Sequence, residues 1–530
     1  MAELSKFAND IFKRTYAFTP DETWEQCAYR VAKAVANTPK QEANFFQIIR
    51  DRQFMPGGRY LYSAGRPIFQ NANCFGYVAK DSREGWAELL HDTTMCLSMG
   101  GGVGISYSEI RPSGSLVGRM GGTSSGPIAL MQIVNEASRF IQQGGRRRAA
   151  LWAGLNWNHP DINTFINIKD WNDDVRTMKS RNYEYPAPLD LTNISVVIGD
   201  EYLSKLQYDA NVQKLHFEIC DRMARTGEPA FRNQSLILKD DPDAVTGNPC
   251  QEAVLHDGDS CNLGSVVLPR INDTNHLEFV VRNAMQFLIN GSAKADYPTE
   301  KIAQTVKRNR RVGLGIMGLH EFVMVNHARY DVNTKLQESL KTWKDVSDNE
   351  AKTYASALGI NTPITKRAVA PTGTISILAE TTSGIEPVFC IAYKRRYLNG
   401  DKHSYQYVVD PTARRLLNQG VPAETIEDAY SLSSDFTRRL RVQAFVQQYT
   451  DQAISSTVNL PIYGSKGNND TKYIADTLAE YLPVLKGITL YPDNSRSGQP
   501  LTPVSLDEAL SQEGTVFEED GDCRGGVCGL

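Results

Sequence analysis

The sequence predicts an α/β fold, and three observations lead to that prediction. Short runs rich in β-branched residues alternate with helical patterns along most of the chain. The strand-like runs are 103–107, 192–198, 264–268, 312–316, 373–378 and 487–491, and the helical stretches are 127–143, 277–294, 335–358, 433–455 and 470–485. No repeat with a period of about 20–50 residues occurs, which excludes a solenoid. No Pro/Ser-rich linker precedes residue 495, so one large domain of strands surrounded by helices is expected.

Residues 1–115 are expected to form a helical N-terminal region. Its stretch 21–36 begins with an acidic cap and repeats apolar residues at helical spacing, namely Trp24, Cys27, Val31 and Val35. The stretch 83–99 has the same pattern and includes Cys96. Cys27 and Cys96 belong to these apolar stripes, so both are predicted to lie in the core.

Residues 116–495 carry the alternating pattern and are predicted to be the α/β domain, whereas residues 496–530 differ. This last segment loses apolar periodicity, becomes acidic and glycine-rich, and contains Cys523 and Cys528. Such composition is typical of a mobile tail.

Composition narrows the class of protein. The formal net charge of −4 gives no overall attraction to nucleic acid or to an anionic membrane, so direct DNA binding is not expected. The sequence has no apolar stretch of signal-peptide or membrane-spanning length, and a cytoplasmic location is expected. In that reducing compartment, the nine cysteines are expected to be core residues, metal ligands or catalysts.

Five cysteines lie outside helical apolar patterns: Cys74, Cys250, Cys261, Cys523 and Cys528. Their spacing disfavours structural zinc, which usually needs two close pairs or a pair with histidines; His256 stands alone. The tail pair in GDCRGGVCGL is interpreted as a thiol carrier that exchanges with a buried disulfide; the alternative is a disordered tail with incidental cysteines. The segment NPCQE, residues 248–252, places a thiol two positions from a carboxylate.

Several motifs together resemble the catalytic large subunit of the ribonucleotide reductases. They are NANCFGY, QGGRRRAA, NPCQE with SCNLGSVVLP, RRVGLGIMGLHEF and APTGTISILAETTSGIEPVF, and they follow that family's order over roughly residues 55–500. The resemblance implies a ten-stranded α/β barrel with Cys250 on a central finger loop. It also implies reduction of ribonucleoside di- or triphosphates to 2′-deoxyribonucleotides for DNA synthesis.

The resemblance also implies roles for the cysteine motifs. Cys250 carries a thiyl radical that takes the 3′-hydrogen of the ribose, Glu252 is the base for the 3′-hydroxyl proton, and Asn248 fixes the sugar. Cys74 and Cys261 supply two electrons and become a disulfide. Cys523 and Cys528 then reduce that disulfide and exchange with a thioredoxin- or glutaredoxin-like protein.

Two further sites concern nucleotides. PTGTIS, residues 371–376, ends in a strand-like run, and its glycine and hydroxyls suit a cradle for a diphosphate; the resemblance assigns the phosphates to Thr372, Gly373, Thr374 and Ser376. It assigns a deoxynucleotide or ATP effector to Asp81 and Ser82 and to a loop with Gln143, Arg146, Arg147 and Arg148. A solvated basic turn is the alternative for the arginines.

The radical source distinguishes classes within the family. One class relays a radical from a ferritin-like, metal-containing partner subunit through two adjacent tyrosines, and another uses adenosylcobalamin. Here Tyr491 is followed by Pro492, which has no redox role, and the flanking KGITLYPDNSRSG is more similar to the cobalamin-dependent class. Adenosylcobalamin is therefore predicted. A divergent relay through Tyr491, with no cofactor bound in this chain, is the alternative.

The start of the chain bears on its regulation. The first helix begins close to position 1, so a compact form without an N-terminal ATP cone is expected, with control of specificity but no inhibition by dATP. Monomer and homodimer remain open. A non-catalytic nucleotide-binding regulator would not need this cysteine set, and a plain thiol–disulfide oxidoreductase would need neither Glu252 nor a phosphate cradle.

Overall fold

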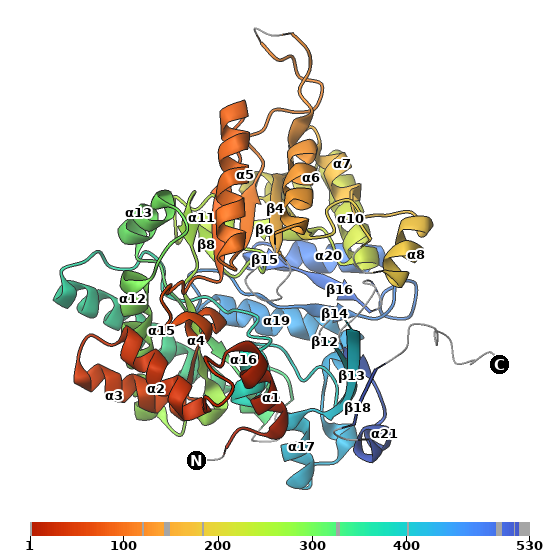
Figure 1. The fold of residues 1–530 in the computed structure, drawn as a ribbon. Coiled ribbons are helices and arrows are strands. Elements are labelled where there is room, and N and C mark those ends of the chain that lie inside the picture. Colours follow the sequence, from red (N-terminus) through yellow and green to blue (C-terminus); the bar gives the residue numbers. More distant parts are fainter. Residues whose placement is uncertain are drawn as a thin grey trace.

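The computed structural model describes residues 3–118, 121–141, 149–182, 185–324, 329–399, 402–493, 495, 501–512 and 515–518. Helices at the N-terminus pack on an α/β body that contains a curled seven-stranded sheet and a three-stranded sheet (Figure 1). The predicted α/β class is confirmed. Among these residues, no helix has the length and apolar character needed to cross a membrane.

The N-terminal helices are α1 (Lys6–Thr15), α2 (Trp24–Val35), α3 (Pro39–Arg50) and α4 (Gly58–Ser63). Helix α2 begins with a capping box between Thr23 and Gln26, which satisfies backbone donors at the helix start. Its apolar stripe packs against α3 and is fully buried at Cys27, as predicted. Helices α2 and α3 both contact α12 (Thr274–Lys294), so this region shares its core with the body.

The seven-stranded sheet has the order β15-β6-β5-β4-β3-β2-β9. Its strands are β2 (Cys74–Val78), β3 (Gly102–Ser106), β4 (Leu151–Asn156), β5 (Thr192–Ile198), β6 (Ala230–Asn233), β9 (Asp259–Ser260) and β15 (Gly487–Ile488). Strands β2 to β6 pair in parallel, and β9 and β15 join the two edges antiparallel. The predicted strands at 103–107 and 192–198 are confirmed.

Helices cover this sheet, as parallel strands buried on both faces require. They are α5 (Arg83–Ser98), α6 (Gly126–Arg139), α7 (Ile162–Asn167), α8 (Asp173–Arg181), α9 (Asp200–Leu206), α10 (Ala210–Thr226) and α11 (Gln234–Leu238). Most of them lie in the upper half of Figure 1. Cys96 is fully buried on α5, which confirms the second predicted core cysteine.

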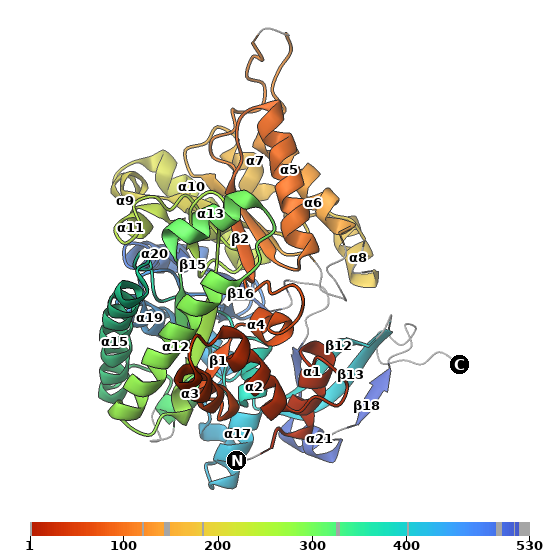
Figure 2. The same cartoon turned by 60° about the vertical axis from the view of Figure 1, so that its left-hand side comes forward.

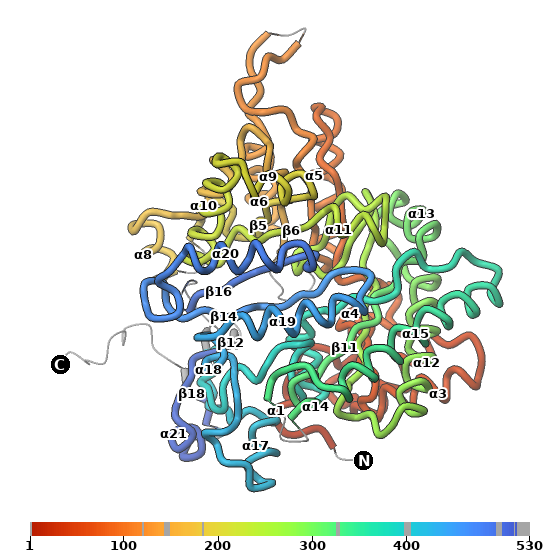
Figure 3. The backbone as a smooth tube through the Cα atoms, turned by 180° about the vertical axis from the view of Figure 1, so that it is seen from behind, coloured from red at the N-terminus to blue at the C-terminus, as the bar shows by residue number. Residues whose placement is uncertain are grey.

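A second set of strands lies beside the first. The three-stranded sheet consists of β1 (Phe54–Pro56), β10 (Leu263–Val267) and β11 (Gly313–Met317), and β14 (Val458–Leu460) pairs in parallel with β16 (Leu490–Pro492). The helices in this part of the chain are α12, α13 (Glu300–Asn309), α14 (Leu319–Met324), α15 (Thr334–Leu358), α19 (Phe436–Gln447) and α20 (Thr471–Tyr481). Helices α19 and α20 cross the back of the molecule (Figure 3).

A short hairpin lies against the seven-stranded sheet. It consists of β7 (Thr246–Gly247) and β8 (Val254–Leu255). A Cβ atom on Gly104 of β3 would lie 1.8 Å from the Gly247 carbonyl oxygen, and one on Gly76 of β2 would lie 2.7 Å from the Thr246 side chain. The hairpin therefore approaches these strands at distances that only glycine permits.

Strand β9, which follows the hairpin, is held by a buried ion network. Arg311 donates to Asp259 over 2.8 Å and to Asp241 over 2.7 Å. Arg311 is 1% exposed and Asp259 is fully buried. Asn309 adds a bond of 2.9 Å to Asp259. Because buried charges need such pairing, the network fixes β9 relative to α13 and β11.

The C-terminal part contains a four-stranded antiparallel sheet of order β17-β12-β13-β18, seen at the lower right of Figure 2. Its strands are β12 (Ala392–Asn399), β13 (Lys402–Val409), β17 (Leu501–Pro503) and β18 (Val516–Glu518), and nearby helices are α17 (Pro411–Asn418), α18 (Ala429–Ser433) and α21 (Leu506–Ser511). The described residues after 495 are thus not simply a mobile tail. They are ordered by tertiary pairing, because β12 and β13 offer free edges and Ala509 is fully buried.

Two other details differ from the sequence analysis. The run 373–378 forms helix α16 (Ile375–Ala379) rather than a strand, because tertiary contacts override the β propensity of its threonine and isoleucines. Strands β1, β2 and β3 lie within residues 1–115, and the last two pair in the seven-stranded sheet. The division of the chain near residues 115 and 495 stays a prediction.

The approach of the hairpin to β3 predicts the effect of one methyl group. Gly104→Ala should lower the free energy of unfolding by about 1–3 kcal/mol, because the new Cβ must displace β7 or β3. Urea unfolding of the full chain measures this change. Gly118→Ala is the matched control, since a Cβ there meets no atom within 4 Å. Equal stability of the two variants would contradict the close approach.

Candidate active site

The turn between β7 and β8 carries the segment NPCQE. Gln251 donates its backbone N–H to the Asn248 carbonyl over 2.9 Å, and Ala253 donates to the Asn248 side-chain oxygen over 3.0 Å. Gln251 adopts a φ of +65°, a left-handed conformation that reverses the chain sharply. The Cys250 thiol is thereby exposed, whereas Asn248 and Glu252 are buried.

Cys74 and Cys261 meet where β2 pairs with β9. The backbone N–H of Cys261 donates to the Cys74 carbonyl over 3.0 Å, and the Cys74 N–H donates to the Cys261 Sγ over 3.0 Å. Both are free thiols, and burial raises the pKa of Cys261 well above its usual value. Asn248 donates its side-chain amide to the Cys74 Sγ over 3.6 Å. Residues far apart in sequence thus form one cluster of thiols and an amide.

Glu252 supplies the carboxyl of this cluster, and its surroundings shift its pKa. Its side chain is 2% exposed, and its Oε2 has no hydrogen-bond partner among the residues that the structure describes. Burial raises the pKa of Glu252 to about 7, although a hydrogen bond to Asn248 acts in the opposite direction. The carboxyl can therefore take up or release a proton near neutral pH, as a general base must.

The loop PTGTIS comes from the other side of the site. Thr372 has a φ of +50°, and its hydroxyl accepts the Gly384 N–H over 2.8 Å. Ser376 is buried and donates to the Gly373 carbonyl over 3.3 Å. Gly373 is exposed, and a Cβ there would meet no atom within 4 Å. The loop therefore presents an open backbone turn.

These parts line one pocket of about 240 Å³. Cys74, Cys250 and Glu252 lie in its wall, together with Thr372, Gly373 and Thr374. Asn248 and Cys261 stand behind Cys74, and Ser376 lies beneath the loop. The structure therefore brings the predicted thiols, the carboxyl and the hydroxyl-rich loop to a single cavity.

Comparison with known families identifies the family of this chain. The model of the ribonucleotide reductase barrel domain matches residues 72–213, 200–342 and 364–491, and that of the ribonucleotide reductase all-alpha domain matches residues 2–68. The chain belongs to the ribonucleotide reductase family. It is a ribonucleoside di- or triphosphate reductase, and its α/β body is the family's barrel domain.

Individual relatives of this reductase agree with that assignment. A vitamin B12-dependent ribonucleoside-diphosphate reductase of Mycobacterium tuberculosis is 28% identical over 91% of this chain and 76% of the relative. An enzyme of the same name from Thermoplasma acidophilum is 28% identical over 89% of this chain and 68% of its own. The ribonucleoside-diphosphate reductase large chain of Schizosaccharomyces pombe is 26% identical over 52% of this chain and 39% of its own.

The other predicted site residues lie away from this pocket or outside the described residues. Asp81 pairs with Arg111 over 2.6 Å, and Ser82 caps helix α5 through Gly85. Tyr491 is half-buried in β16 and lies beside Gly227, at whose position a Cβ would be 3.1 Å from its ring. The remaining predicted residues, Gln143, Arg146, Arg147, Arg148, Cys523 and Cys528, lie outside the described residues.

The sequence did not predict the backbone contacts that hold Glu252 in place. Its carbonyl accepts the Ala453 N–H over 2.9 Å, and the preceding Asp451 carboxylate accepts the backbone N–H groups of Lys366 and Arg367 over 2.9 and 2.7 Å. This clamp joins the segment that leads into PTGTIS to the segment that holds Glu252. Backbone contacts have no motif, so the sequence offered no signal for it.

The buried carboxyl predicts a stability difference that depends on pH. Between the unfolded pKa of 4.5 and the folded pKa of about 7, the folded state binds more protons, so stability falls as pH rises through this window. Glu252→Gln removes this loss and should be more stable than the wild type at pH 8, by up to about 3 kcal/mol. Urea unfolding at pH 5 and pH 8 tests this. Parallel pH dependence of the two proteins would contradict an unpaired buried carboxyl.

Proposed function

We propose that this reductase converts ribonucleotides to 2′-deoxyribonucleotides through a thiyl radical on Cys250. The observation that carries the proposal is the shared pocket of an exposed thiol, a buried carboxyl with a free oxygen, and a nearby thiol pair. A plain thiol exchange protein would use the thiols but not the carboxyl. The assembly instead matches a reaction that moves hydrogen atoms, a proton and two electrons.

In the proposed reaction, the Cys250 thiyl takes the 3′-hydrogen, and Glu252 takes the 3′-hydroxyl proton while the 2′-hydroxyl leaves as water. Cys74 and Cys261 together give two electrons and two protons. One proton completes the leaving water, the other becomes the new hydrogen on C2′, and an S–S bond forms between the two cysteines. Glu252 returns its proton to the 3′-oxygen, and Cys250 returns a hydrogen to C3′ and is a thiyl again. The amide of Asn248 holds the sugar and the Cys74 thiol in register.

We propose that the body is a ten-stranded barrel in which the β7–β8 hairpin is the finger loop. The parallel strands β2 to β6 supply five staves. A second series of five is formed by β10, β11, residues 365–369, residues 453–460 and β16. Support comes from the bonds Leu314 N–H to Lys366 carbonyl and Val369 N–H to Ala453 carbonyl and from the pairs β10–β11 and β14–β16.

We propose that the substrate phosphates bind at Thr372, Gly373, Thr374 and Ser376. The open turn at Gly373 gives phosphate oxygens access to backbone N–H groups, and the Thr374 side chain is partly exposed beside it. A specificity effector is proposed near Asp81 and Ser82, where Arg111 supplies a cation.

We propose adenosylcobalamin as the radical source. The relatives named vitamin B12-dependent support it. The exposed Cys250 thiol also supports it, because a cofactor held at the open side of the pocket can reach this thiol. Tyr16, Gly58 and Gly100 line this pocket and would face the bound cofactor. When bound, adenosylcobalamin supplies a carbon radical by Co–C homolysis. Pro492 interrupts the alternative tyrosine relay.

We propose that Cys523 and Cys528 reduce the Cys74–Cys261 disulfide and are themselves reduced by a thioredoxin-like protein. The support is the burial of both thiols of the pair, at 8% and 1% exposure. A protein reductant cannot reach them directly.

Replacing Cys250 tests the central step. Cys250→Ala should abolish deoxynucleotide formation and keep nucleotide binding, because the proposed thiyl has no substitute. Product analysis with dithiothreitol and adenosylcobalamin, alongside a nucleotide-binding titration, measures both. Cys220→Ala, which removes a buried thiol from helix α10, is the control and should retain turnover. Turnover by the Cys250 variant would end the thiyl assignment.

The tail cysteines predict a dependence on the reductant. Replacing both Cys523 and Cys528 by Ser should remove activity supported by thioredoxin and spare activity supported by dithiothreitol, because only the small reductant reaches the buried pair. Rates with the two reductants are compared in one preparation. An equal loss with both reductants would exclude a shuttle.

The proposed radical source predicts how replacing Tyr491 affects activity. The chain should need added adenosylcobalamin and no second protein, and Tyr491→Phe should keep most activity because the ring serves packing against Gly227. Activity assays with and without the cofactor, and optical detection of its cleavage, measure this. An inactive phenylalanine variant together with activity only in the presence of a metal-loaded ferritin-like partner would favour the two-subunit class.

A further inference from the structure

A separate pocket of about 700 Å³ lies between helix α15 and the loops after α19 and α20. Its wall is formed by residues of α15 and of the segments 362–367, 447–451 and 483–486. None of its lining residues lines the candidate active site. Its volume is in the range of ligand pockets, about 300–1,000 Å³.

The charge of this pocket is opposite to that of the whole chain. Its lining has three carboxylates, Asp240, Asp348 and Asp451, and five basic side chains, Lys344, Lys352, Lys366, Arg367 and Lys486. The pocket therefore carries an excess of positive charge on a protein with a formal net charge of −4. Such a concentration of one sign attracts anions of small size.

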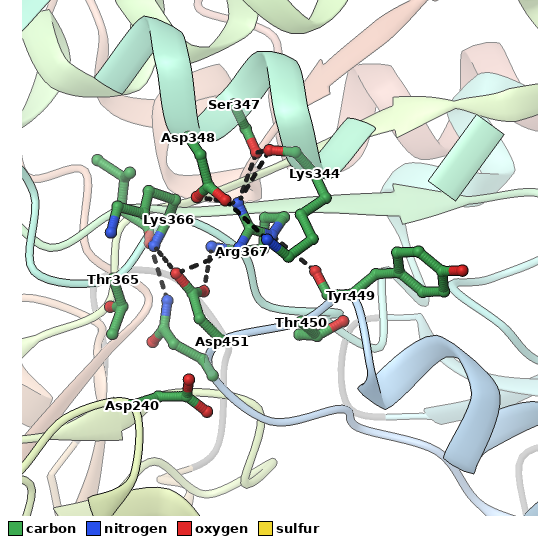
Figure 4. Close-up of polar contacts among 12 residues, drawn as sticks. Asp240, Lys344, Ser347, Asp348, Thr365, Lys366, Arg367, Tyr449, Thr450 and Asp451 are labelled. Atoms are coloured by element: carbon green, nitrogen blue, oxygen red, sulfur yellow. Dashed lines mark hydrogen bonds and ion pairs between the residues drawn. The ribbon is translucent and has the colours of Figure 1, made fainter. Parts of the chain in front are cut away.

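The floor of the pocket is fixed by internal pairing. The Arg367 guanidinium is buried and donates to Asp348 over 2.6 Å, to the Ser347 hydroxyl over 2.7 Å and to the Tyr449 carbonyl over 2.7 Å. Figure 4 shows Asp348 and Ser347 of helix α15 directed at Arg367, with Asp451 on the opposite side. These bonds hold the pocket in one shape before any ligand arrives.

Lys486 completes the floor. It is 2% exposed and donates to the Asp451 carbonyl over 2.6 Å and to Asp240 over 2.5 Å. Lys344 pairs with Asp348 over 3.1 Å. Each of the three carboxylates is therefore already engaged by a cation or by backbone N–H groups.

Two lysines remain. Within the part of the chain that the structure describes, neither the Lys352 nor the Lys366 ammonium forms a salt bridge or hydrogen bond. Lys352 is exposed on α15, and Lys366 is half-buried beside the clamp of Asp451. Free ammonium groups beside a rigid floor are suited to a ligand with several negative oxygens, because each acts as a point charge toward phosphate.

We propose that this pocket binds a polyphosphate chain, inorganic or carried by a nucleoside, between Lys352 and Lys366. Linked phosphates present negative charges a few bonds apart and so can engage both lysines at once. A monovalent anion engages only one. The pocket is thus an anion site outside the catalytic and effector sites.

Calorimetric titration of the full chain with inorganic tripolyphosphate tests the proposal. The Thr374→Ala/Ser376→Ala variant is used as the background, because it weakens phosphate binding at the candidate active site. In this background, the component of binding that depends on Lys352 and Lys366 should amount to one tripolyphosphate per chain. Adding Lys352→Gln and Lys366→Gln should weaken binding by about tenfold or more. The matched control, Lys341→Gln with Lys472→Gln, removes the same charge from exposed positions outside the pocket and should bind like the background.

A second measurement needs no substitution. Acetylation of the wild-type chain, read by mass spectrometry, should slow at Lys352 and Lys366 when tripolyphosphate is present and stay constant at Lys341. Competition by ATP in the phosphate-loop variant separates the two sources: displacement indicates a nucleotide and its absence an inorganic chain, and both support the site. Binding that survives the Lys352/Lys366 change, or acetylation that tripolyphosphate leaves unaltered at both lysines, overturns the proposal.

Discussion

The geometry of this reductase depends on the close approach of the β7–β8 hairpin to β2 and β3. Gly104 leaves space for the hairpin backbone at Gly247, and Gly76 leaves space for the Thr246 and Leu255 side chains, where a larger residue would collide with them. The turn beyond the hairpin can therefore expose Cys250 while Asn248 and Glu252 stay buried. The same approach sets β9 against β2, so that Cys261 meets Cys74. One packing constraint thus orders both the Cys250 thiol and the Cys74–Cys261 pair.

The site combines two kinds of environment that would be difficult to provide on one surface. The thiol at the tip is accessible, and the carboxyl two residues away is shielded enough that its pKa rises to about 7. Burial of the Arg311 network behind β9 and the Asp451 clamp behind Ala453 keeps these positions rigid. Asp451 of this clamp also lines the basic pocket, and Ala453, two residues later, holds the backbone of Glu252 in the active site.

Much of the fold followed from periodicity, and the failures have physical causes. Long amphipathic helices such as α12 and α15, and buried strands such as β5 and β10, have patterns that neighbours cannot easily override. Helix α16 and strands β17 and β18 are short, and tertiary contacts decide their conformation. In the site, NPCQE was visible because its groups are adjacent in sequence. The meeting of Cys74 with Cys261 was expected only from the family resemblance, and the support from Ala453 and Asp451 was not expected at all.

The pairing of β18 with β13 bears on the proposed carrier role of Cys523 and Cys528. Strand β18 ends at Glu518, so the two cysteines follow it by five and ten residues. A fully extended chain of these lengths spans at most about 17 and 34 Å. In the proposed role, the point at which β18 pairs with β13 therefore sets both the origin and the upper bound of the distance that each thiol can cover.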